Sequence, residues 1–324
     1  MAGPRILVVR LGSMGDILHT LPAVASLKHS LPHSHLSWLM HPRWAPLLDG
    51  NPFLDEVIPF HRGSLGTMRA AWKRFHSQRF DVAVDFQGLV QSALVAALAR
   101  PDKLYGFGPM QARERPAVLF YSHATNARSV HMVDQNLELA AAAGASSMLR
   151  AFHIPLGSPE GKLPQGRFVL TSPLAGWGAK QWPAEFFAEL ARRLRAECSL
   201  TLVVNGPPQA NALLSGITGA TLHLSGLAGL IDATRKAAAV VGVDSGPLHL
   251  AAALGKPGVA IYGPTDPVRN GPYGGTITVL RAAGAETTHR RDTDPAASMR
   301  AIHPDEVFEA LRASMAVKSA GCPA

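Results

Sequence analysis

Cysteine is nearly absent from this chain of 324 residues: it has two, Cys198 and Cys322, far apart. Two distant cysteines exclude a disulfide framework and a cysteine-rich zinc site, and they favour a reducing compartment. No uncharged apolar run reaches the roughly 18 residues that a membrane-spanning helix needs. Arg10 interrupts the apolar run near the N-terminus, which argues against a signal peptide. We therefore expect a cytoplasmic protein without a membrane span.

Charged residues are also scarce, at 17%, whereas hydrophobic residues make up 47% of the chain. Such a chain can bury a large core, which excludes global disorder. The net charge of +8 is divided evenly, with +4 in residues 1–160 and +4 in residues 161–324. Basic residues concentrate in 61–79, which holds five Lys or Arg and no acidic residue. This stretch is either a solvated helix face or a surface for nucleic acid, anionic membrane or phosphorylated ligands.

Short apolar strands alternate with helical patterns along the chain, and the pattern restarts after a Gly- and Pro-rich linker at 155–166. Strands are expected at 5–11, 36–40, 56–60, 81–85, 103–107, 167–171, 200–205, 222–224, 240–243 and 258–262. Helices are expected at 16–30, 64–79, 89–99, 131–143, 183–197, 227–238, 248–254 and 303–317. Apolar strands separated by helices point to parallel sheets covered on both faces.

These patterns predict an α/β protein of two doubly wound domains, 1–158 and 159–324, in which the last helix packs back toward the first domain. In such sheets, ligands bind beyond the carboxyl ends of the strands.

The first candidate motif, RLGSMGDILHTLP (10–22), takes a buried strand through Gly-x-x-Gly into a helix. The glycines permit a tight turn and a close approach of a ligand, and the N–H groups at the helix start favour an anion. The chain has neither the dinucleotide fingerprint nor a P-loop. Asp16 follows the strand, where it either caps the helix or acts as a general base.

The second motif, VGVDSGPLHLA (241–251), again joins a strand to a helix. Ser245 is a plausible cap, and Pro247 fits the first turn. The positive end of this helix is suited to a diphosphate. His249 lies one turn in, where it is either a structural residue or a phosphate contact.

A third motif is the Gly-rich loop AGWGAKQWP (175–183). Its Lys180 is either an exposed loop lysine or a group that neutralises a leaving phosphate. The segment YGPTDP (262–267) is a further strand end that feeds a turn. Asp292-Thr293-Asp294 has the spacing of metal-dependent sugar transferases, but it lies in a polar loop and does not follow a strand, which argues against a metal site there.

Four segments occur together and in order: RLGSMGDILHTLPA (10–23), DFQGLVQSA (85–93), GWGAKQWP (176–183) and VGVDSGPLHLAAALGKPGVAIYGPTDP (241–267). Together they resemble the ADP-heptose:lipopolysaccharide heptosyltransferases of glycosyltransferase family 9. The run Arg113, Glu114, Phe120 and Tyr121 and the segment HMVDQNLEL (131–139) are most similar to the heptosyltransferase I branch of that family.

The resemblance implies a GT-B fold, with two Rossmann-like domains facing across a cleft. It implies inverting, metal-independent transfer of heptose from ADP-heptose to a Kdo residue of Kdo-lipid A, in the synthesis of the lipopolysaccharide inner core. ADP-heptose is then a substrate, and no cofactor is expected. The partners would be the acidic lipid acceptor and an anionic membrane surface rather than nucleic acid. The location would be cytoplasmic, at the inner face of the inner membrane.

Carried over by position, the resemblance makes Asp16 the base that deprotonates the acceptor hydroxyl. The residues implied for donor binding are Gly176, Lys180, Asp244, Ser245, Gly246, Pro247, His249 and Thr265. Those implied for acceptor binding are Ser13, Met14, Gly15, Arg62, Gln87 and Arg113.

The chain departs from the family pattern at NGPPQANAL (205–213). The family often has an acidic residue here for the donor ribose, whereas this chain offers Gln209 or Asn211 as hydrogen-bonding substitutes. Two alternatives therefore stay open: a related transferase with another donor or acceptor, and a non-catalytic sugar-nucleotide-binding protein.

Overall fold

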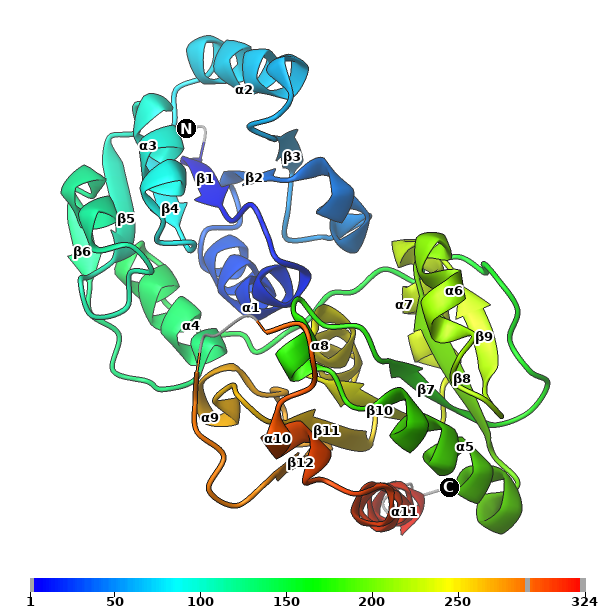
Figure 1. The fold of residues 1–324 in the computed structure, drawn as a ribbon. Helices are drawn as coiled ribbons and strands as arrows, with labels where there is room; N and C mark the ends of the chain where they lie inside the picture. Colours follow the sequence, from blue (N-terminus) through cyan, green and yellow to red (C-terminus); the bar gives the residue numbers. More distant parts are fainter. Residues whose placement is uncertain (1–2, 289–291, 321–324) are drawn as a thin grey trace. The chain divides into compact units, whose positions relative to one another are not determined.

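The chain folds into two compact units, Met1–Pro155 and Leu156–Ala324. The computed structural model describes residues 3–288 and 292–320 (Figure 1). Each unit is built on one six-stranded sheet whose neighbouring strands all run parallel. Among the described residues, no helix is both long and apolar enough to cross a membrane.

The sheet of the first unit has the strand order β3-β2-β1-β4-β5-β6. Its strands are β1 (Arg5–Val9), β2 (His35–Met40), β3 (Glu56–Pro59), β4 (Val82–Asp85), β5 (Lys103–Phe107) and β6 (His123–Thr125). The helices are α1 (Met14–Ser30), α2 (Leu65–Ser77), α3 (Val90–Leu98) and α4 (Met132–Ala142), with the short 3₁₀ helices η1 (Pro42–Leu48) and η2 (Arg115–Phe120).

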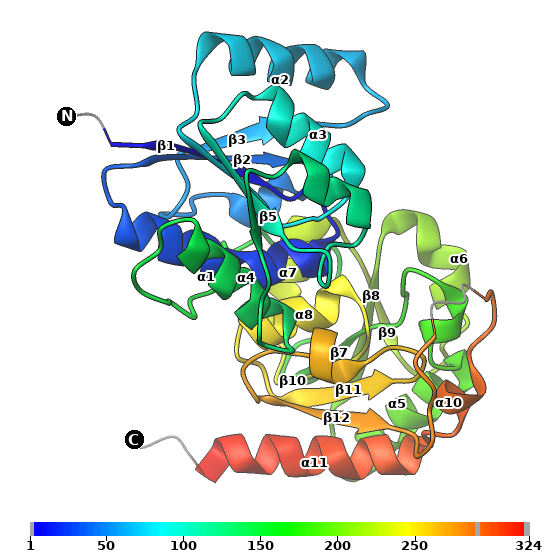
Figure 2. The ribbon, with the colours of Figure 1, turned by 90° about the vertical axis from the view of Figure 1, so that its left-hand side faces the viewer.

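Helices cover both faces of this sheet, because alternate residues of each buried strand point to opposite sides. Leu7 and Val9 of β1 share one core cluster with Phe75 of α2 and Ala96 of α3. Helices α1 and α4 pack together on the other face, as Figure 2 shows.

The sheet of the second unit has the order β12-β11-β10-β7-β8-β9. Its strands are β7 (Phe168–Ser172), β8 (Thr201–Gly206), β9 (Thr221–Leu224), β10 (Ala239–Val243), β11 (Gly258–Tyr262) and β12 (Ile277–Arg281). The helices are α5 (Ala184–Cys198), α6 (Asn211–Leu214), α7 (Leu227–Lys236), α8 (Gly246–Ala253), α9 (Pro267–Asn270), α10 (Ala297–Arg300) and α11 (Pro304–Ala320), with the 3₁₀ turns η3 (Gly178–Lys180) and η4 (Pro208–Ala210).

Helices α5 and α11 pack against each other and bury Phe187 and Phe308 against this sheet. Helices α7 and α8 cover the opposite face. Gly258 lets β10 and β11 lie close together, since a Cβ atom there would be 2.1 Å from the Val240 carbonyl oxygen.

In both sheets the strand order reverses at one point: between β1 and β4 in the first, and between β7 and β10 in the second. Loops that leave the carboxyl ends of such a strand pair diverge to opposite sides and leave a crevice that favours ligand binding. The loops after β1 and β10 carry the first two candidate motifs, so the fold puts both at switch points.

The predicted strands and helices are all present, with ends shifted by a few residues. The edge strands β6 and β12 and the short helices were not expected from the sequence. Strand β12 has a mostly exposed or half-exposed pattern, and β6 has three residues, so neither shows the apolar run that marks a buried strand.

Candidate active site

Asp16 lies in the first turn of α1, directly beyond the carboxyl end of β1. Its Oδ2 atom accepts hydrogen bonds from the backbone N–H of Ser13 (3.0 Å) and from the Ser13 hydroxyl (3.1 Å). A carboxylate that reaches back to the residue before the helix satisfies an N–H group which the helix itself leaves unpaired. The helix-capping role considered from the sequence is therefore real, and it uses one of the two carboxylate oxygens.

Two arginines occupy the other carboxylate oxygen of Asp16. The Nη2 atom of Arg10 lies 2.5 Å from Oδ1, and the Nη2 atom of Arg113 lies 2.9 Å from the same atom. Arg10 is 1% exposed, whereas Arg113 is 41% exposed. Asp16 thus sits between one buried and one accessible cation.

These contacts determine the charge state of Asp16. Burial pushes the pKa of its carboxyl group upward, but the charges of Arg10 and Arg113 and the Ser13 N–H bond outweigh burial and hold that pKa well below its usual range. Asp16 is therefore ionised at neutral pH and can accept a proton, as a general base must. Its basicity is low as long as both arginines stay in contact.

Arg10 is held by the loop that follows β4. Its Nη1 atom donates to the carbonyl oxygen of Phe86, and the neighbouring Leu11 N–H donates to Gln87 Oε1 at 2.7 Å. Gln87, predicted to bind the acceptor, thus ties the end of β1 to the end of β4. The strand order places these two ends side by side, so the switch point of the sheet fixes Arg10 and through it Asp16.

The β4 loop is in turn fixed by the fully buried Asp85. Its carboxylate accepts hydrogen bonds from the Tyr121 hydroxyl (2.7 Å), the Ser92 hydroxyl (2.8 Å) and the Gln87 N–H (2.8 Å). Burial raises the pKa of Asp85, and burial together with the nearby carboxylate raises that of Tyr121. No role was predicted for Arg10 or Asp85 from the sequence. Their positions could have indicated one, because a charged residue inside or at the end of an apolar strand needs a buried partner.

Arg113 is brought to Asp16 by a close approach of its own segment to the same loop. Gly88 has a φ of +70°, and a Cβ atom there would lie 3.2 Å from the backbone nitrogen of Arg113. The Glu114 N–H donates to the Gly88 carbonyl (2.9 Å), and the Glu114 carboxylate accepts from the Val90 N–H at the start of α3 (2.7 Å). The backbone at Arg113 is therefore anchored although its side chain is exposed.

The remaining residues predicted to bind the acceptor lie in two places, at the start of α1 and in the turn before α2. Met14 and Gly15 are buried in the first turn of α1, and Ser13 is exposed beside them. Arg62 is exposed in the turn before α2, and none of the described contacts joins it to Asp16. Their roles in binding stay predictions.

The second unit has a matching arrangement at its own switch point, between β7 and β10. Lys180, in the loop after β7, places its Nζ atom 2.5 Å from Asp244 Oδ2. His249, one turn into α8, places Nε2 3.5 Å from Asp244 Oδ1. Burial raises the pKa of Asp244, but the hydrogen bond from His249 and the charge of Lys180 outweigh this and lower it well below the ordinary value. The structure thus brings three residues predicted for the donor into one cluster.

Two hydroxyl groups beside this cluster have unused hydrogen-bonding capacity. Within the described residues, Ser245 Oγ and Thr265 Oγ1 are buried without a hydrogen-bond partner. Ser245 immediately precedes α8, yet its side chain does not cap that helix. A buried hydroxyl without a partner is unfavourable unless a ligand or water completes it, so both are suited to an oxygen-rich ligand.

The backbone at the start of α8 offers fewer donors than the sequence led us to expect. The N–H groups of Leu248 and His249 both bond to the Ser245 carbonyl oxygen, and Pro247 has no N–H. Gly246 is the helix residue before that proline. Side chains, chiefly Lys180, therefore supply most of the positive character at this site.

The Lys180 loop is supported from two sides. The Lys180 ammonium lies 4.3 Å from the centre of the Trp177 ring, and the Ala179 N–H donates to the Asp292 carbonyl at 3.0 Å. Segment 292–294 therefore backs the loop. Gly176 is exposed at the loop tip, with open space where a side chain would be. Among residues 3–288 and 292–320, no three His, Cys, Asp or Glu side chains gather as metal ligands.

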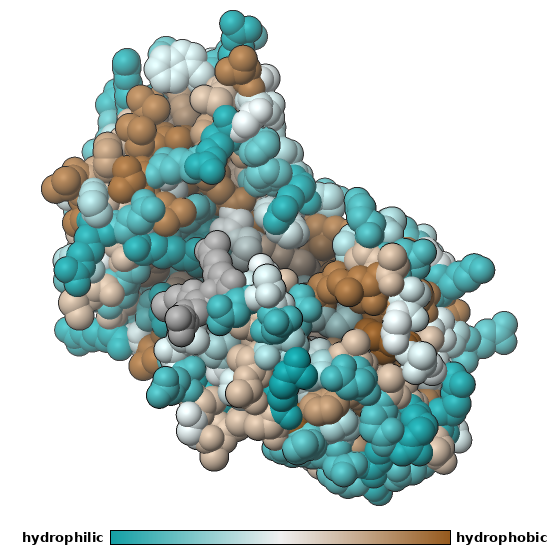
Figure 3. All heavy atoms as spheres, viewed as in Figure 1, coloured by the Kyte–Doolittle hydropathy of each residue, from teal (hydrophilic) through white to brown (hydrophobic). Residues whose placement is uncertain are grey.

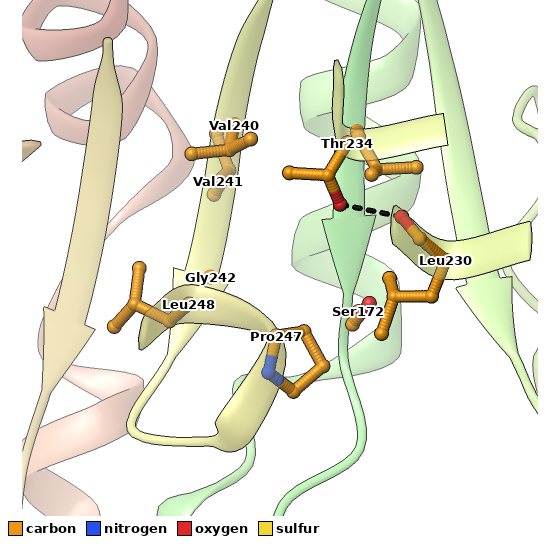
Figure 4. A pocket seen from close by; sticks show the side chains of 9 residues that line it. Ser172, Leu230, Thr234, Val240, Val241, Gly242, Pro247 and Leu248 are labelled. Atoms are coloured by element: carbon orange, nitrogen blue, oxygen red, sulfur yellow. Dashed lines mark hydrogen bonds between the residues drawn. The ribbon is translucent and has the colours of Figure 1, made fainter. Parts of the chain in front are cut away.

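A small pocket lies under α8 beside these groups (Figure 4). Pro247 and Leu248 of α8 and Leu230 of α7 line it together with Ser172 at the end of β7. Thr234 also faces it, but its hydroxyl donates to the Leu230 carbonyl at 2.7 Å. The lining is mainly apolar, so this pocket is suited to packing rather than to phosphate.

Comparison with known proteins identifies the family of the chain. The family model described as glycosyltransferase family 9 (heptosyltransferase) matches residues 68–299. Lipopolysaccharide heptosyltransferase 1 of Escherichia coli is 31% identical over 87% of this chain and 93% of its own length. The protein of the same name from Pseudomonas aeruginosa is 30% identical over 83% of this chain and 81% of its own.

Solved structures resemble the whole chain. The E. coli heptosyltransferase WaaC with ADP has a TM-score of 0.77 at 26% identity, covering 96% of this chain and 99% of that one. A family 9 glycosyltransferase from Veillonella parvula has a TM-score of 0.80 at 20% identity, covering 97% and 98%, and supports the fold alone.

The two parallel six-stranded sheets and these structural relatives define a glycosyltransferase of the GT-B fold, as the resemblance implied. Since the family model matches most of the chain, the protein belongs to glycosyltransferase family 9, the heptosyltransferase family. It is therefore an enzyme, which removes the non-catalytic alternative.

The geometry predicts that Asp16→Asn lowers the stability of the first unit by about 3–5 kcal/mol, because it leaves the buried Arg10 without its counter-charge. Hydrogen exchange of first-unit amides measures this. The difference from the wild-type protein should shrink as pH falls below about 4, since a carboxyl group with a depressed pKa stabilises the folded state only while it is ionised. Asp102→Asn, which breaks the exposed pair with Arg79, should have a much smaller effect, because solvent screens that pair. An equal effect of the two substitutions would contradict this account.

Proposed function

We propose that this enzyme transfers heptose from ADP-heptose to a Kdo residue of Kdo-lipid A, by a single displacement with inversion and without a metal ion. The observation that carries the proposal is an ionised, arginine-bound Asp16 at the switch point of the first sheet, in a chain about 30% identical over most of its length to lipopolysaccharide heptosyltransferases 1. In this reaction the acceptor hydroxyl gives its proton to Asp16, its oxygen bonds to the anomeric carbon of the heptose, and ADP leaves with the bonding electrons.

The second unit supports donor binding. The E. coli relative has been solved with ADP and with ADP-2-deoxy-2-fluoro heptose. Here Lys180 offers one ammonium, and Ser245 and Thr265 offer two hydroxyls that have no hydrogen-bond partner in the described part of the chain. A cation and hydroxyl donors fixed in advance stabilise the negative charge that builds on a departing diphosphate. Asp244 holds Lys180, and we expect the diphosphate to share that ammonium.

This set of groups also explains how the reaction proceeds without a metal ion. Lys180 provides an ammonium group, and the His249 ring lies 3.5 Å from the other carboxylate oxygen of Asp244. The positive end of the α8 dipole adds a smaller contribution.

A related family 9 transferase with another donor is the second candidate, and one region favours it. Among residues 205–213, which lack an acid, the Asn205 amide is already bonded to His223 and to the Ser225 hydroxyl. Gln209 and Asn211 are exposed after β8 and are the groups left for a donor ribose. An amide binds a ribose hydroxyl less tightly than a carboxylate does, so this region favours a donor that depends less on its ribose for binding.

We further propose that α2 contacts an anionic membrane surface, at the inner face of the inner membrane, where the lipid acceptor resides. Leu65, Met68 and Trp72 are 76%, 39% and 48% exposed, and their spacing places them on one side of the helix. Arg69 and Lys73 are exposed next to them. Figure 3 shows hydrophobic and hydrophilic residues side by side over α2. An apolar stripe flanked by basic residues is typical of a helix that lies in a membrane interface.

The proposal predicts that the purified protein converts ADP-heptose and Kdo-lipid A to a heptosylated lipid in the presence of EDTA. Mass spectrometry identifies the product, and the carbon–hydrogen coupling at its anomeric centre gives the configuration. A requirement for added metal would contradict the mechanism. A faster reaction with another sugar nucleotide in the same assay would favour the second candidate.

A matched pair of lysine variants separates donor binding from general effects in that assay. Lys180→Ala should raise the KM for ADP-heptose and lower kcat, together by about 100-fold or more in kcat/KM, because a charged contact to the diphosphate is lost. Lys162→Ala removes an exposed lysine of the same unit and should leave both constants unchanged. Equal activity of the two variants would refute the role of Lys180.

The membrane proposal predicts binding to vesicles that contain anionic phospholipid, weaker binding to neutral vesicles, and release by salt. Replacing Leu65 and Trp72 by Ser should weaken binding about tenfold or more, since two apolar contacts are lost. Leu213→Ser, an exposed leucine of the second unit (64%), is the control and should bind as the wild type does. If the control and the α2 variant bind alike, α2 is not the contact.

A further inference from the structure

Four donor groups among the described residues surround the carboxylate of Asp16, which offers about four lone-pair sites. Ser13 donates its N–H and its hydroxyl to Oδ2. Arg113 donates to Oδ1, and the Arg10 Nη2 atom lies 2.5 Å from the same oxygen as an ion-pair partner. A base in this condition cannot take the proton of a substrate hydroxyl until one of its partners leaves.

The partners on Oδ1 differ in how easily they can leave. Arg10 is fully enclosed and also bonds to the Phe86 carbonyl oxygen, so moving it would unpair buried groups. The Arg113 side chain is 41% exposed, and within the described residues Asp16 is its one charged or hydrogen-bonding partner. Arg113 is therefore the group that can withdraw at low cost.

The surroundings of Arg113 allow its guanidinium to move while its backbone stays in place. Glu114 forms hydrogen bonds with Gly88 and with the start of α3, and Gly88 packs against the backbone nitrogen of Arg113. The side chain thus pivots about a fixed point. Its planar fork of donors matches a second carboxylate or a phosphate as well as it matches Asp16.

We propose that Arg113 is a removable lock on Asp16, and that an anionic group of the acceptor opens it by drawing the guanidinium away. This inference rests on the proposed role of Asp16 as the base. The withdrawn guanidinium frees a lone pair on Oδ1, and the acceptor hydroxyl donates to that lone pair. Asp16 also loses one of the two cations that hold its basicity down, while Arg10 keeps it ionised. Arg113 is accordingly a positioning residue, which makes transfer depend on an acid group in the acceptor.

Two simpler roles predict different kinetics. If Arg113 only binds the acceptor anion, its removal slows transfer to anionic acceptors and leaves neutral ones unaffected. If it only maintains the fold around Asp16, its removal slows transfer to both. Of the three roles, only the lock predicts that removing Arg113 speeds transfer to a neutral acceptor.

The experiment measures kcat and KM for four acceptors: Kdo-lipid A, its carboxyl methyl ester, its dephosphorylated form, and the form that carries both changes. Wild-type protein and Arg113→Ala are compared, with Arg113→Gln as a second variant that retains hydrogen bonding without charge. Arg115→Ala removes a neighbouring exposed arginine and controls for net charge. The first three acceptors show whether the sugar carboxylate or a lipid phosphate opens the lock.

We expect kcat for the fully neutral acceptor to rise about tenfold or more in Arg113→Ala and in Arg113→Gln, since one charged hydrogen bond corresponds to at least about a tenfold change. The KM for Kdo-lipid A should rise in both variants, because the acceptor anion loses its guanidinium partner. Arg115→Ala should behave as the wild type does. An unchanged or lower kcat for the neutral acceptor in correctly folded variants would overturn the lock. Absence of transfer to Kdo-lipid A by the wild-type protein would instead overturn the proposed function.

Discussion

The contact between Arg10 and Asp16 is the interaction on which the arrangement at the first unit's switch point depends. Arg10 is a fully buried cation, and a buried charge is tolerated only with a partner of opposite sign. That requirement keeps Asp16 ionised, places it beyond β1, and ties it through Phe86 and Gln87 to the loop after β4. Because β1 and β4 are the strands where the sheet order reverses, the fold itself creates the crevice that this pair occupies.

The second unit also has an ion pair at its switch point, but there the cation, not the carboxylate, is the group that we propose contacts the substrate. At its switch point Asp244 stabilises Lys180, which we propose binds the donor diphosphate, whereas in the first unit Arg10 and Arg113 stabilise Asp16, the proposed base. In both places a charged side chain that we propose takes part in the reaction is held in position by an ion pair.

The sequence predicted the architecture well, because apolar strands and intervening helices follow directly from periodicity and from glycine and proline positions. It also indicated that Asp16, Lys180, Asp244 and His249 lie in or just after the loops that leave strand ends, as they do in the structure; their roles stay predictions. It could not predict that Asp16 is enclosed by two arginines, because Arg113 is distant in the chain and reaches Asp16 only through the Gly88 turn. Nor could it predict that Ser245 leaves its helix uncapped, which depends on a side-chain rotamer rather than on residue type.

The charge state of Asp16 in the unliganded protein is the most direct test of this account. Carbon-13 NMR of protein labelled at the aspartate side-chain carboxyl carbon, with the Asp16 signal assigned by its absence in Asp16→Asn, follows that carboxyl group as pH is lowered. We expect Asp16 to stay ionised through the range near pH 3.9, roughly where an ordinary aspartate takes up its proton. A midpoint at or above that value would mean that Arg10 and Arg113 do not control Asp16, and would contradict the account.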